Sequence, residues 1–166
     1  MRKKMKNTPV KVPLPGSSKP TYEEVVACYS QGRFQDGYDL AGKALAYEPH
    51  NLVMLNAAAT CAFNAGMYQQ AEERWKCLAE LHPQYADAYF NLGILYIQMQ
   101  RISDSEANYR KAIAADPRHK SAINNLGVML QEQKRYDEAE SFYRSALAVS
   151  PDFVDVRYNL AMLYQE

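Results

Sequence analysis

Three asparagines are the side chains whose type and spacing best suit recognition chemistry. Asn91, Asn125 and Asn159 recur at intervals of 34 residues. A side-chain amide both donates and accepts hydrogen bonds, so each can hold one peptide group of an extended chain without regard to its sequence. This regular spacing predicts a surface that binds another polypeptide.

The side chains that most often carry catalysis or metals are not arranged for either. The three histidines fall about 34 residues apart in segments around prolines, too far from one another to share a metal whose ligand bonds are about 2 Å long. The three cysteines have no metal-ligand spacing, and buried thiols usually behave as small apolar groups. No glycine-rich phosphate loop occurs. We therefore predict no catalytic residue, no metal and no cofactor; the residues concerned are His50, His82, His119, Cys28, Cys61 and Cys77.

Charge and composition exclude several classes of function. The 19 basic and 19 acidic residues balance, but six of the basic ones precede the first acidic residue, Glu23, so the body of the chain is acidic. Nucleic-acid binders need cations along the folded surface, so this distribution argues against nucleic acid. No apolar run approaches the roughly 18 residues of a membrane span, and no apolar signal segment follows the first basic residues. We expect a cytoplasmic protein with reduced thiols.

A 34-residue repeat organises the chain. Four prolines, Pro49, Pro83, Pro117 and Pro151, stand 34 residues apart. Aligning the sequence on them brings small residues into register, such as the column that contains Gly93 and Gly127. The aromatic residues Trp75, Tyr109 and Tyr143 form another column, and acidic pairs such as Glu72-Glu73 and Asp137-Glu138 stand a few residues before it. Strict register across four units predicts a repeat architecture.

Each unit contains two runs of apolar residues at helical spacing, separated by a short turn. In the unit that begins at Ala86, the first run includes Leu92, Gly93 and Tyr96, and the second includes Ser105 and Tyr109. Spacings of three and four place each run on one helix face. Proline ends the second helix, because it lacks an N–H and disfavours helix in the residue before it. The acidic pairs should be solvated near the start of the second helix, where they suit the helix dipole. The chain is thus predicted to be all-α, a stack of antiparallel helix pairs.

The pattern resembles the tetratricopeptide repeat. The best unit runs from Ala122 to Pro151 and matches the small residue after Leu, the Tyr before the acidic pair, the two alanines, the aromatic and the proline. The resemblance implies a right-handed superhelical solenoid over residues 18–166, behind a basic tail at 1–17. We set the repeats at 18–51, 52–85, 86–119 and 120–153, with a partial fifth at 154–166.

The two ends depart from the repeat. Thr21 and Glu24 form a T-x-x-E capping box, so the first helix is expected to begin there. At the other end, the partial unit supplies one helix bearing Leu160, Leu163 and Tyr164 and no second helix. That leaves an apolar face that either pairs with a copy of the chain or continues into a longer protein. We favour the second alternative, because an uncapped solenoid end is prone to aggregate.

The family resemblance also implies where a ligand would bind, since the first helix of each unit lines a concave groove. The asparagine column falls on it and is similar to the asparagine ladder in the repeats of O-linked N-acetylglucosamine transferases. Apolar residues in neighbouring columns, among them Tyr22, Val26 and Tyr29, would form pockets in the groove or belong to the core. The predicted peptide-binding residues are Asn91, Asn125, Asn159, Phe90, Ile94, Asn124, Val128 and Tyr158.

Two functions fit this reading. The first is a protein-interaction scaffold that binds a peptide or a partner helix in the groove. The second is a non-catalytic, substrate-recruiting part of a larger enzyme such as a glycosyltransferase. A role in binding the acidic tails of chaperones is disfavoured, because the lysines and asparagines of the family's carboxylate clamp are replaced, for example by Tyr22 and Phe90.

Overall fold

The computed structural model describes residues 18–164, so the basic tail predicted for 1–17 lies outside the described residues. Within that range the chain is all-α, and its nine helices follow one another without a strand. The bounds are α1 (Tyr22–Ser30), α2 (Phe34–Tyr47), α3 (Leu52–Asn64), α4 (Tyr68–Leu81), α5 (Ala86–Gln98), α6 (Ile102–Ala115), α7 (Lys120–Glu132), α8 (Tyr136–Val149) and α9 (Val154–Leu163).

The helix ends follow the local sequence. Thr21 accepts a hydrogen bond from the Glu24 backbone N–H while the Glu24 side chain accepts one from the Thr21 N–H, so the predicted capping box is confirmed. The even-numbered helices from α2 to α8 each end at a cap residue directly before a repeat proline. The turn inside each pair needs a residue in the left-handed region. Gly32 and Gly66 supply it in the first two pairs, with φ of 71° and 75°.

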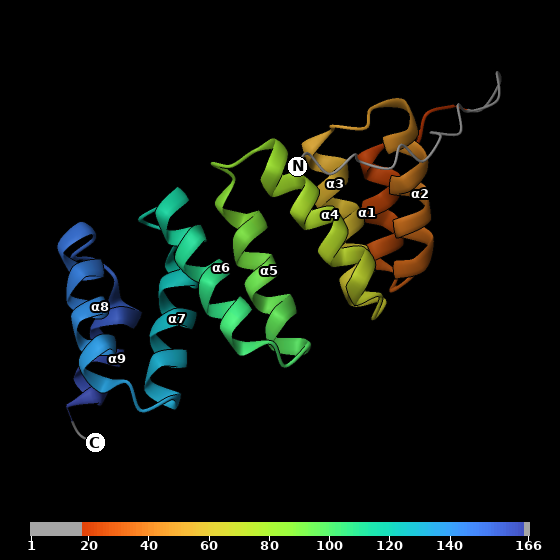
Figure 1. Cartoon of the computed structure of the whole chain (residues 1–166). Coiled ribbons are helices and arrows are strands. Elements are labelled where there is room, and N and C mark those ends of the chain that lie inside the picture. The colour runs from red at the N-terminus through yellow and green to blue at the C-terminus, as the bar shows by residue number, and fades with distance from the viewer. Residues whose placement is uncertain (1–17, 165–166) are drawn as a thin grey trace, which may run out of the picture.

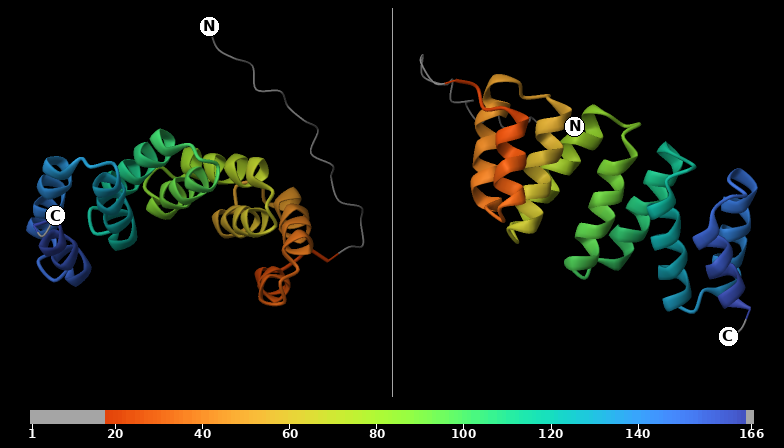
Figure 2. Two further views of the ribbon diagram at one scale, coloured as in Figure 1. Left: turned by 90° about the horizontal axis from the view of Figure 1, so that it is seen from below. Right: turned by 180° about the vertical axis from the view of Figure 1, so that it is seen from behind.

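The helices form an arch. Each helix packs against the next, and α1 also contacts α3 as α7 contacts α9. Figure 1 shows them as a row from α1 to α9, and the left view of Figure 2 shows the row bending, with the first helix of each pair toward the inner side. The odd-numbered helices therefore share one curved face.

No helix in residues 18–164 is long and apolar enough to cross a membrane.

The predicted small-residue column is where paired helices come closest. Gly93 lies beneath the ring of Tyr109, and Gly127 lies beneath the ring of Tyr143. The Ser105 hydroxyl donates a 2.8 Å hydrogen bond to the Gly93 carbonyl, which fastens α6 to α5 inside the core. Burial raises the pKa of Tyr143 to about 12. Its hydroxyl therefore stays protonated and donates to Gln131 Oε1 at 2.8 Å.

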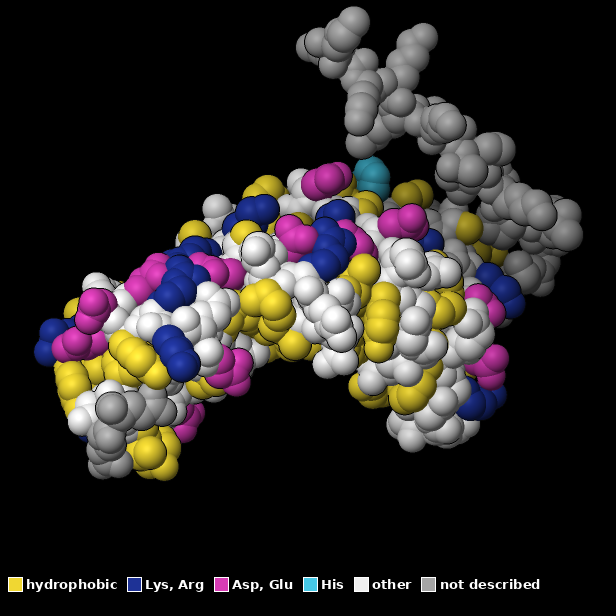
Figure 3. Space-filling view, turned by 60° about the horizontal axis from the view of Figure 1, so that its bottom comes forward, with side chains coloured by type: hydrophobic (Ala, Val, Ile, Leu, Met, Phe, Trp, Pro, Cys, Tyr) yellow, Lys and Arg dark blue, Asp and Glu magenta, His cyan; other side chains and the backbone are white. Residues whose placement is uncertain are grey.

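A series of ion pairs links successive repeats. Arg101 precedes α6, and its Nη1 reaches back to Glu72 of α4 at 3.3 Å from both carboxylate oxygens. One repeat later, Arg135 reaches back to Glu106 of α6, with Nη1 and Oε2 2.7 Å apart. In Figure 3 basic and acidic side chains are interleaved along one edge of the arch, while hydrophobic side chains gather toward its hollowed side. We call these contacts the inter-repeat ion ladder.

The prediction that Glu72 is simply solvated was wrong. Its side chain is only 14% exposed and also binds Lys76 at 2.6 Å. Burial raises the pKa of the Glu72 carboxyl, but hydrogen bonds from Lys76 and Tyr96 and the charges of Lys76 and Arg101 outweigh burial, so the pKa is lowered overall. The sequence pattern placed the carboxylate on the correct helix; it did not show that the next repeat would supply an arginine to cover it.

Candidate functional site

The predicted site residues lie on the first helices of three successive pairs. None of the eight is fully buried, and Tyr158 is well exposed. The odd-numbered helices place them along the inner side of the arch (Figure 2). Their positions are Phe90, Asn91 and Ile94 on α5; Asn124, Asn125 and Val128 on α7; and Tyr158 and Asn159 on α9.

The three asparagines of the column differ in what their amides already bind. Asn159 Nδ2 donates to Asn124 Oδ1 at 2.7 Å, so this pair ties α9 to α7. Asn125 Nδ2 donates to the Tyr109 hydroxyl at 3.3 Å. The Asn91 side chain makes no hydrogen bond to any residue in 18–164. Asn91 therefore has its whole amide available to a ligand, whereas Asn125 and Asn159 offer their carbonyl oxygens.

Phe90 belongs partly to the packing between repeats. Its ring lies 5.9 Å from that of Tyr109 and 4.9 Å from that of His119, measured between centroids. His119 Nδ1 accepts the Ala122 backbone N–H at 3.1 Å and so caps α7, while Nε2 lies 3.0 Å from Asp87 Oδ1. Phe90 and Ile94 both pack against the second core cluster. These two residues thus shape the groove floor more than they project from it.

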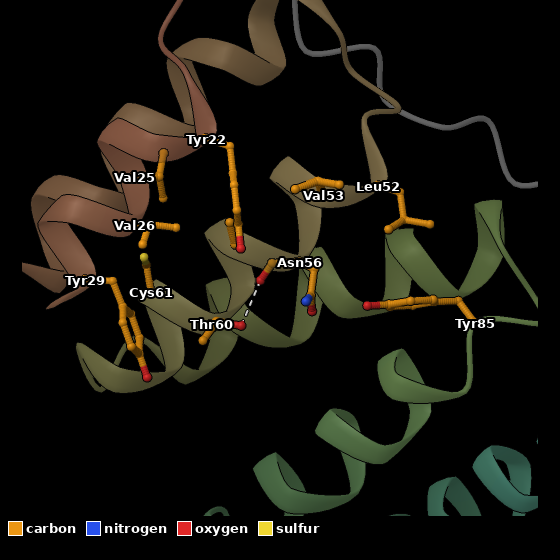
Figure 4. Close-up of a pocket in the computed structure, with 11 residues that line it drawn as sticks. Tyr22, Val25, Val26, Tyr29, Leu52, Val53, Asn56, Thr60, Cys61 and Tyr85 are labelled. Carbon is orange, nitrogen blue, oxygen red and sulfur yellow. Dashed lines mark hydrogen bonds between the residues drawn. The ribbon is translucent and has the colours of Figure 1, made fainter. Parts of the chain in front are cut away.

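A cavity of about 530 Å³ opens between α1 and α3, in the half of the arch that the predicted site residues do not reach. Its wall on α1 is made by exposed side chains including Tyr22, Val26 and Tyr29, and α3 contributes Val53 and other residues. Figure 4 shows the Tyr85 ring, just before α5, pointing toward Asn56. The lining is Tyr22, Val25, Val26, Tyr29, Leu52, Val53, Asn56, Ala57, Thr60, Cys61 and Tyr85, and no charged side chain is among them.

The polar groups of the cavity are held in place from behind. Asn56 Oδ1 accepts a 3.0 Å hydrogen bond from Trp75 Nε1, which leaves the Asn56 N–H groups for a ligand. The Thr60 hydroxyl donates a 2.9 Å hydrogen bond to the backbone carbonyl of Asn56 (Figure 4). Burial raises the pKa of the Tyr85 hydroxyl, and Asp87 adds to the increase, so this hydroxyl is a neutral donor near neutral pH. The cavity offers apolar surface with a few fixed donors.

The sequence indicated part of this cavity. The apolar groove columns include Tyr22, Val26 and Tyr29, which the periodicity could not separate from core. Tyr85 was missed, because it stands outside the groove columns and enters the cavity only through the turn between α4 and α5. Among residues 18–164, no cluster of His, Cys, Asp or Glu could hold a metal ion.

Comparison with known proteins agrees with the repeat. The tetratricopeptide repeat family model matches residues 90–152. A crystal structure of MamA protein superposes with a TM-score of 0.70 at 20% identity, covering 86% of this chain and 78% of that one. A thermophilic tetratricopeptide-repeat protein of Thermus thermophilus, TTC0263, superposes with a TM-score of 0.61 at 23% identity, covering 86% of this chain and 79% of that one. YrrB, described as a tetratricopeptide-repeat protein with an unusual peptide-binding site, superposes with a TM-score of 0.64 at 17% identity, covering 86% of this chain and 74% of that one.

These likenesses establish the fold. A search of curated protein sequences finds none that matches the chain significantly. The structural relatives share too little sequence to carry their ligands over to this chain. Residues 90–152 match the tetratricopeptide repeat family, and residues 18–164 form an all-α solenoid of the tetratricopeptide-repeat type.

Proposed function

We propose that the chain is a protein-interaction scaffold that holds a peptide segment or a partner helix along its inner face. The observation that carries this proposal is the uncharged cavity between α1 and α3. Exposed apolar side chains that surround fixed hydrogen-bond donors are typical of ligand sites. Tyr22, Val26 and Tyr29 are each more than 40% exposed, so a partner would remove considerable apolar area from water.

The rest of the inner face supports an extended ligand. Asn91 offers a whole amide, and Asn125 and Asn159 each keep a free carbonyl oxygen. Amides at repeat spacing would bind the ligand backbone while the cavity accepts an apolar side chain, which is how grooves combine affinity with specificity. Tyr158 and Val128 would contact the segment farther along. We propose that residues 18–166 act as one binding unit, divided into the repeats given above, and that the protein works in the cytoplasm.

The second candidate, recruitment of substrates to a larger enzyme such as a glycosyltransferase, would use the same face. It rests on the asparagine column at positions 91, 125 and 159. Both candidates share the same binding step, so one experiment addresses that step for both.

A selection of random twelve-residue peptides on phage tests the groove. Peptides selected on the parent chain should bind it saturably and lose at least about tenfold in affinity to Val53→Asp, because a carboxylate would be buried against apolar surface. Val149→Asp is the matched control. Val149 is 45% exposed and Val53 46%, but Val149 ends α8, away from the cavity.

The result separates the groove from other surfaces. An equal loss of peptide affinity in both variants, or no loss of affinity in Val53→Asp, would show that the selected peptides bind elsewhere. Asn91→Ala in the same assay tests the asparagine column separately from the cavity. Since its amide holds nothing in residues 18–164, any weakened binding would come from the ligand contact itself.

A further inference from the structure

The cavity between α1 and α3 is bordered by aromatic rings. Tyr22 and Tyr29 line it from α1, and Tyr85 lines it from the turn before α5. Figure 4 shows Asn56 of α3 between Tyr22 and the Tyr85 ring. Tyr22 and Tyr29 are 46% and 41% exposed, so a ligand in the cavity would lie against their rings. The cavity therefore offers flat apolar walls, and none of its lining residues is charged.

The polar groups of the cavity suit a ligand rich in carbonyl oxygens. Asn56 uses its own carbonyl oxygen to accept from Trp75, so both of its amide N–H bonds are left to a ligand. The hydroxyls of Tyr22 and Tyr29 make no hydrogen bond to any residue in 18–164. These three side chains can all donate. A polypeptide whose carbonyl groups are not bound by its own N–H groups matches such donors.

The polyproline II helix is a conformation of that kind. It has no internal hydrogen bonds, so its carbonyl oxygens face their surroundings. Proline-rich segments dock in this conformation in grooves lined by aromatic side chains, because little chain entropy is lost on binding. Residues 9–15, which precede the described part of the chain, have the sequence PVKVPLP. Each proline fixes its own φ near −65° and keeps the residue before it extended, so this sequence favours polyproline II.

The described chain begins beside the cavity. Lys19 forms an ion pair with Glu48, in the turn between α2 and α3. Glu48 also accepts a 2.7 Å hydrogen bond from Asn51, the cap of α3. Leu52 and Val53, which line the cavity, directly follow that cap. Lys19 thus holds the entering chain close to the start of α3.

The link between this anchor and residues 9–15 is short enough for the segment to fold back. Pro15 precedes Lys19 by four residues, which span at most about 14 Å. Tyr22 and Tyr29 are about 10 Å apart along the helix axis. Gly16 lies within the link and permits a sharp turn. Residues 9–15 can therefore reach the whole length of the cavity.

We propose that residues 9–15 occupy this cavity within the same molecule, in the polyproline II conformation, and that a partner must displace them. The proposal rests on the proposed function, because it gives the same cavity its first occupant. The Val12-Pro13 and Leu14-Pro15 pairs lie against the tyrosine rings, the carbonyl groups of the segment accept from Asn56, and Lys11 stays in solvent. External ligands of the cavity then share this chemistry: they are extended, apolar and rich in proline.

The attachment makes even weak binding effective. A segment joined by a short link is present at an effective concentration of the order of millimolar. An intrinsic Kd of about 0.1 mM would therefore keep the cavity about nine-tenths occupied. An external ligand of the cavity would lose about tenfold in affinity to this competition.

The single tryptophan of the chain reports on the cavity. Trp75 Nε1 donates to Asn56, so the indole N–H signal in an NMR spectrum responds to whatever binds that amide. In the isotope-labelled full chain, the double substitution Val12→Asp and Leu14→Asp should shift this signal. The reason is that carboxylates do not remain against an apolar wall, so the segment leaves the cavity.

A matched variant controls for the added charge. Met5→Asp with Asn7→Asp introduces the same two carboxylates outside residues 9–15. The indole signal of this control should stay at its position in the parent chain. All four substituted residues precede the first helix, so circular dichroism should show the same helix content in both variants.

A synthetic peptide with the sequence of residues 8–16 then measures the competition. It should bind the Val12→Asp, Leu14→Asp chain saturably and return the indole signal to its position in the parent. It should bind the parent and the Met5→Asp, Asn7→Asp chain about tenfold more weakly. The same peptide with aspartate at positions 12 and 14 should not bind any of the three chains.

Three results would overturn the proposal. The first is an indole signal that does not move in the Val12→Asp, Leu14→Asp chain, and the second is equal affinity of the peptide, or no affinity, for that chain and the parent. The third is a signal difference between these two chains that fades on about hundredfold dilution, because a contact within one molecule does not depend on concentration. A neighbouring copy would then supply the segment. In each case other peptides can still bind the cavity, so the selection with Val53→Asp tests the proposed function separately.

Discussion

A Cβ atom built on Gly127 would lie 2.1 Å from Cε1 of Tyr143. The backbone of α7 at Gly127 and the Tyr143 ring of α8 therefore leave no room between them for a Cβ atom. Because Tyr143 is fully buried, its ring cannot swing into solvent to make space. The packing of this helix pair depends on glycine.

Gly127→Ala should therefore lower the free energy of unfolding by about 1–3 kcal/mol, because overpacking forces the helices apart. Urea unfolding followed by circular dichroism measures the change. Gly42→Ala is the matched control, since a Cβ at Gly42, inside α2, would meet nothing within 4 Å. It should stabilise the chain by about 0.5–1 kcal/mol through helix propensity. Destabilisation of equal size in both variants would contradict the packing argument.

The four turns inside the helix pairs make a second prediction. Gln100 and Lys134 adopt φ of 57° and 59° where the first two pairs have glycine. Left-handed conformation costs a non-glycine residue about 1–2 kcal/mol, partly offset by the greater freedom of glycine when unfolded. Lys134→Gly should therefore raise the free energy of unfolding by about 0.5–1 kcal/mol in urea titrations, and Gly66→Ala should lower it. Stabilisation by Gly66→Ala would show that the turn is not strained.

The inter-repeat ion ladder predicts a pH dependence. The hydrogen bond from Arg135 lowers the pKa of the Glu106 carboxyl, and Arg110 contributes further, although burial opposes both. A carboxyl whose pKa is lower in the folded state stabilises the fold above its unfolded pKa of about 4.3. This stabilisation is lost as the pH falls through the lower folded value. Glu106→Gln should thus cost about 1–2 kcal/mol at neutral pH, and the difference from the parent should shrink below about pH 4.

Urea titrations at a series of pH values test this sign. Glu132→Gln serves as the reference, because Glu132 is an exposed carboxylate of α7 outside the ladder. It should change stability by less than about 0.5 kcal/mol. A difference for Glu106→Gln that stays constant from neutral pH down to about pH 3 would mean that the lost contact is not an ionic one.

The periodicity predicted the helices well because proline and small residues repeat in strict register. Pro83 and Pro117 directly follow the caps of α4 and α6, and Gly127 lies where the helices touch, as expected. The ion ladder could not be predicted in the same way. Whether Arg101 would reach Glu72, 29 residues earlier, depends on the angle between successive pairs, which one unit does not encode. The same holds for Tyr85, which enters the cavity from a turn.

The asparagine column gives the last prediction, because its members should differ in stability as well as in binding. Asn91 binds nothing in residues 18–164, so Asn91→Ala should leave the unfolding free energy within about 0.5 kcal/mol of the parent. Asn159→Ala removes the 2.7 Å bond to Asn124 and should cost about 0.5–1.5 kcal/mol. Calorimetry or urea unfolding distinguishes them. If neither substitution changes the unfolding free energy, the hydrogen bond between α9 and α7 contributes nothing measurable. If Asn91→Ala costs more than Asn159→Ala, the Asn91 amide has a structural partner and is not free to bind a ligand.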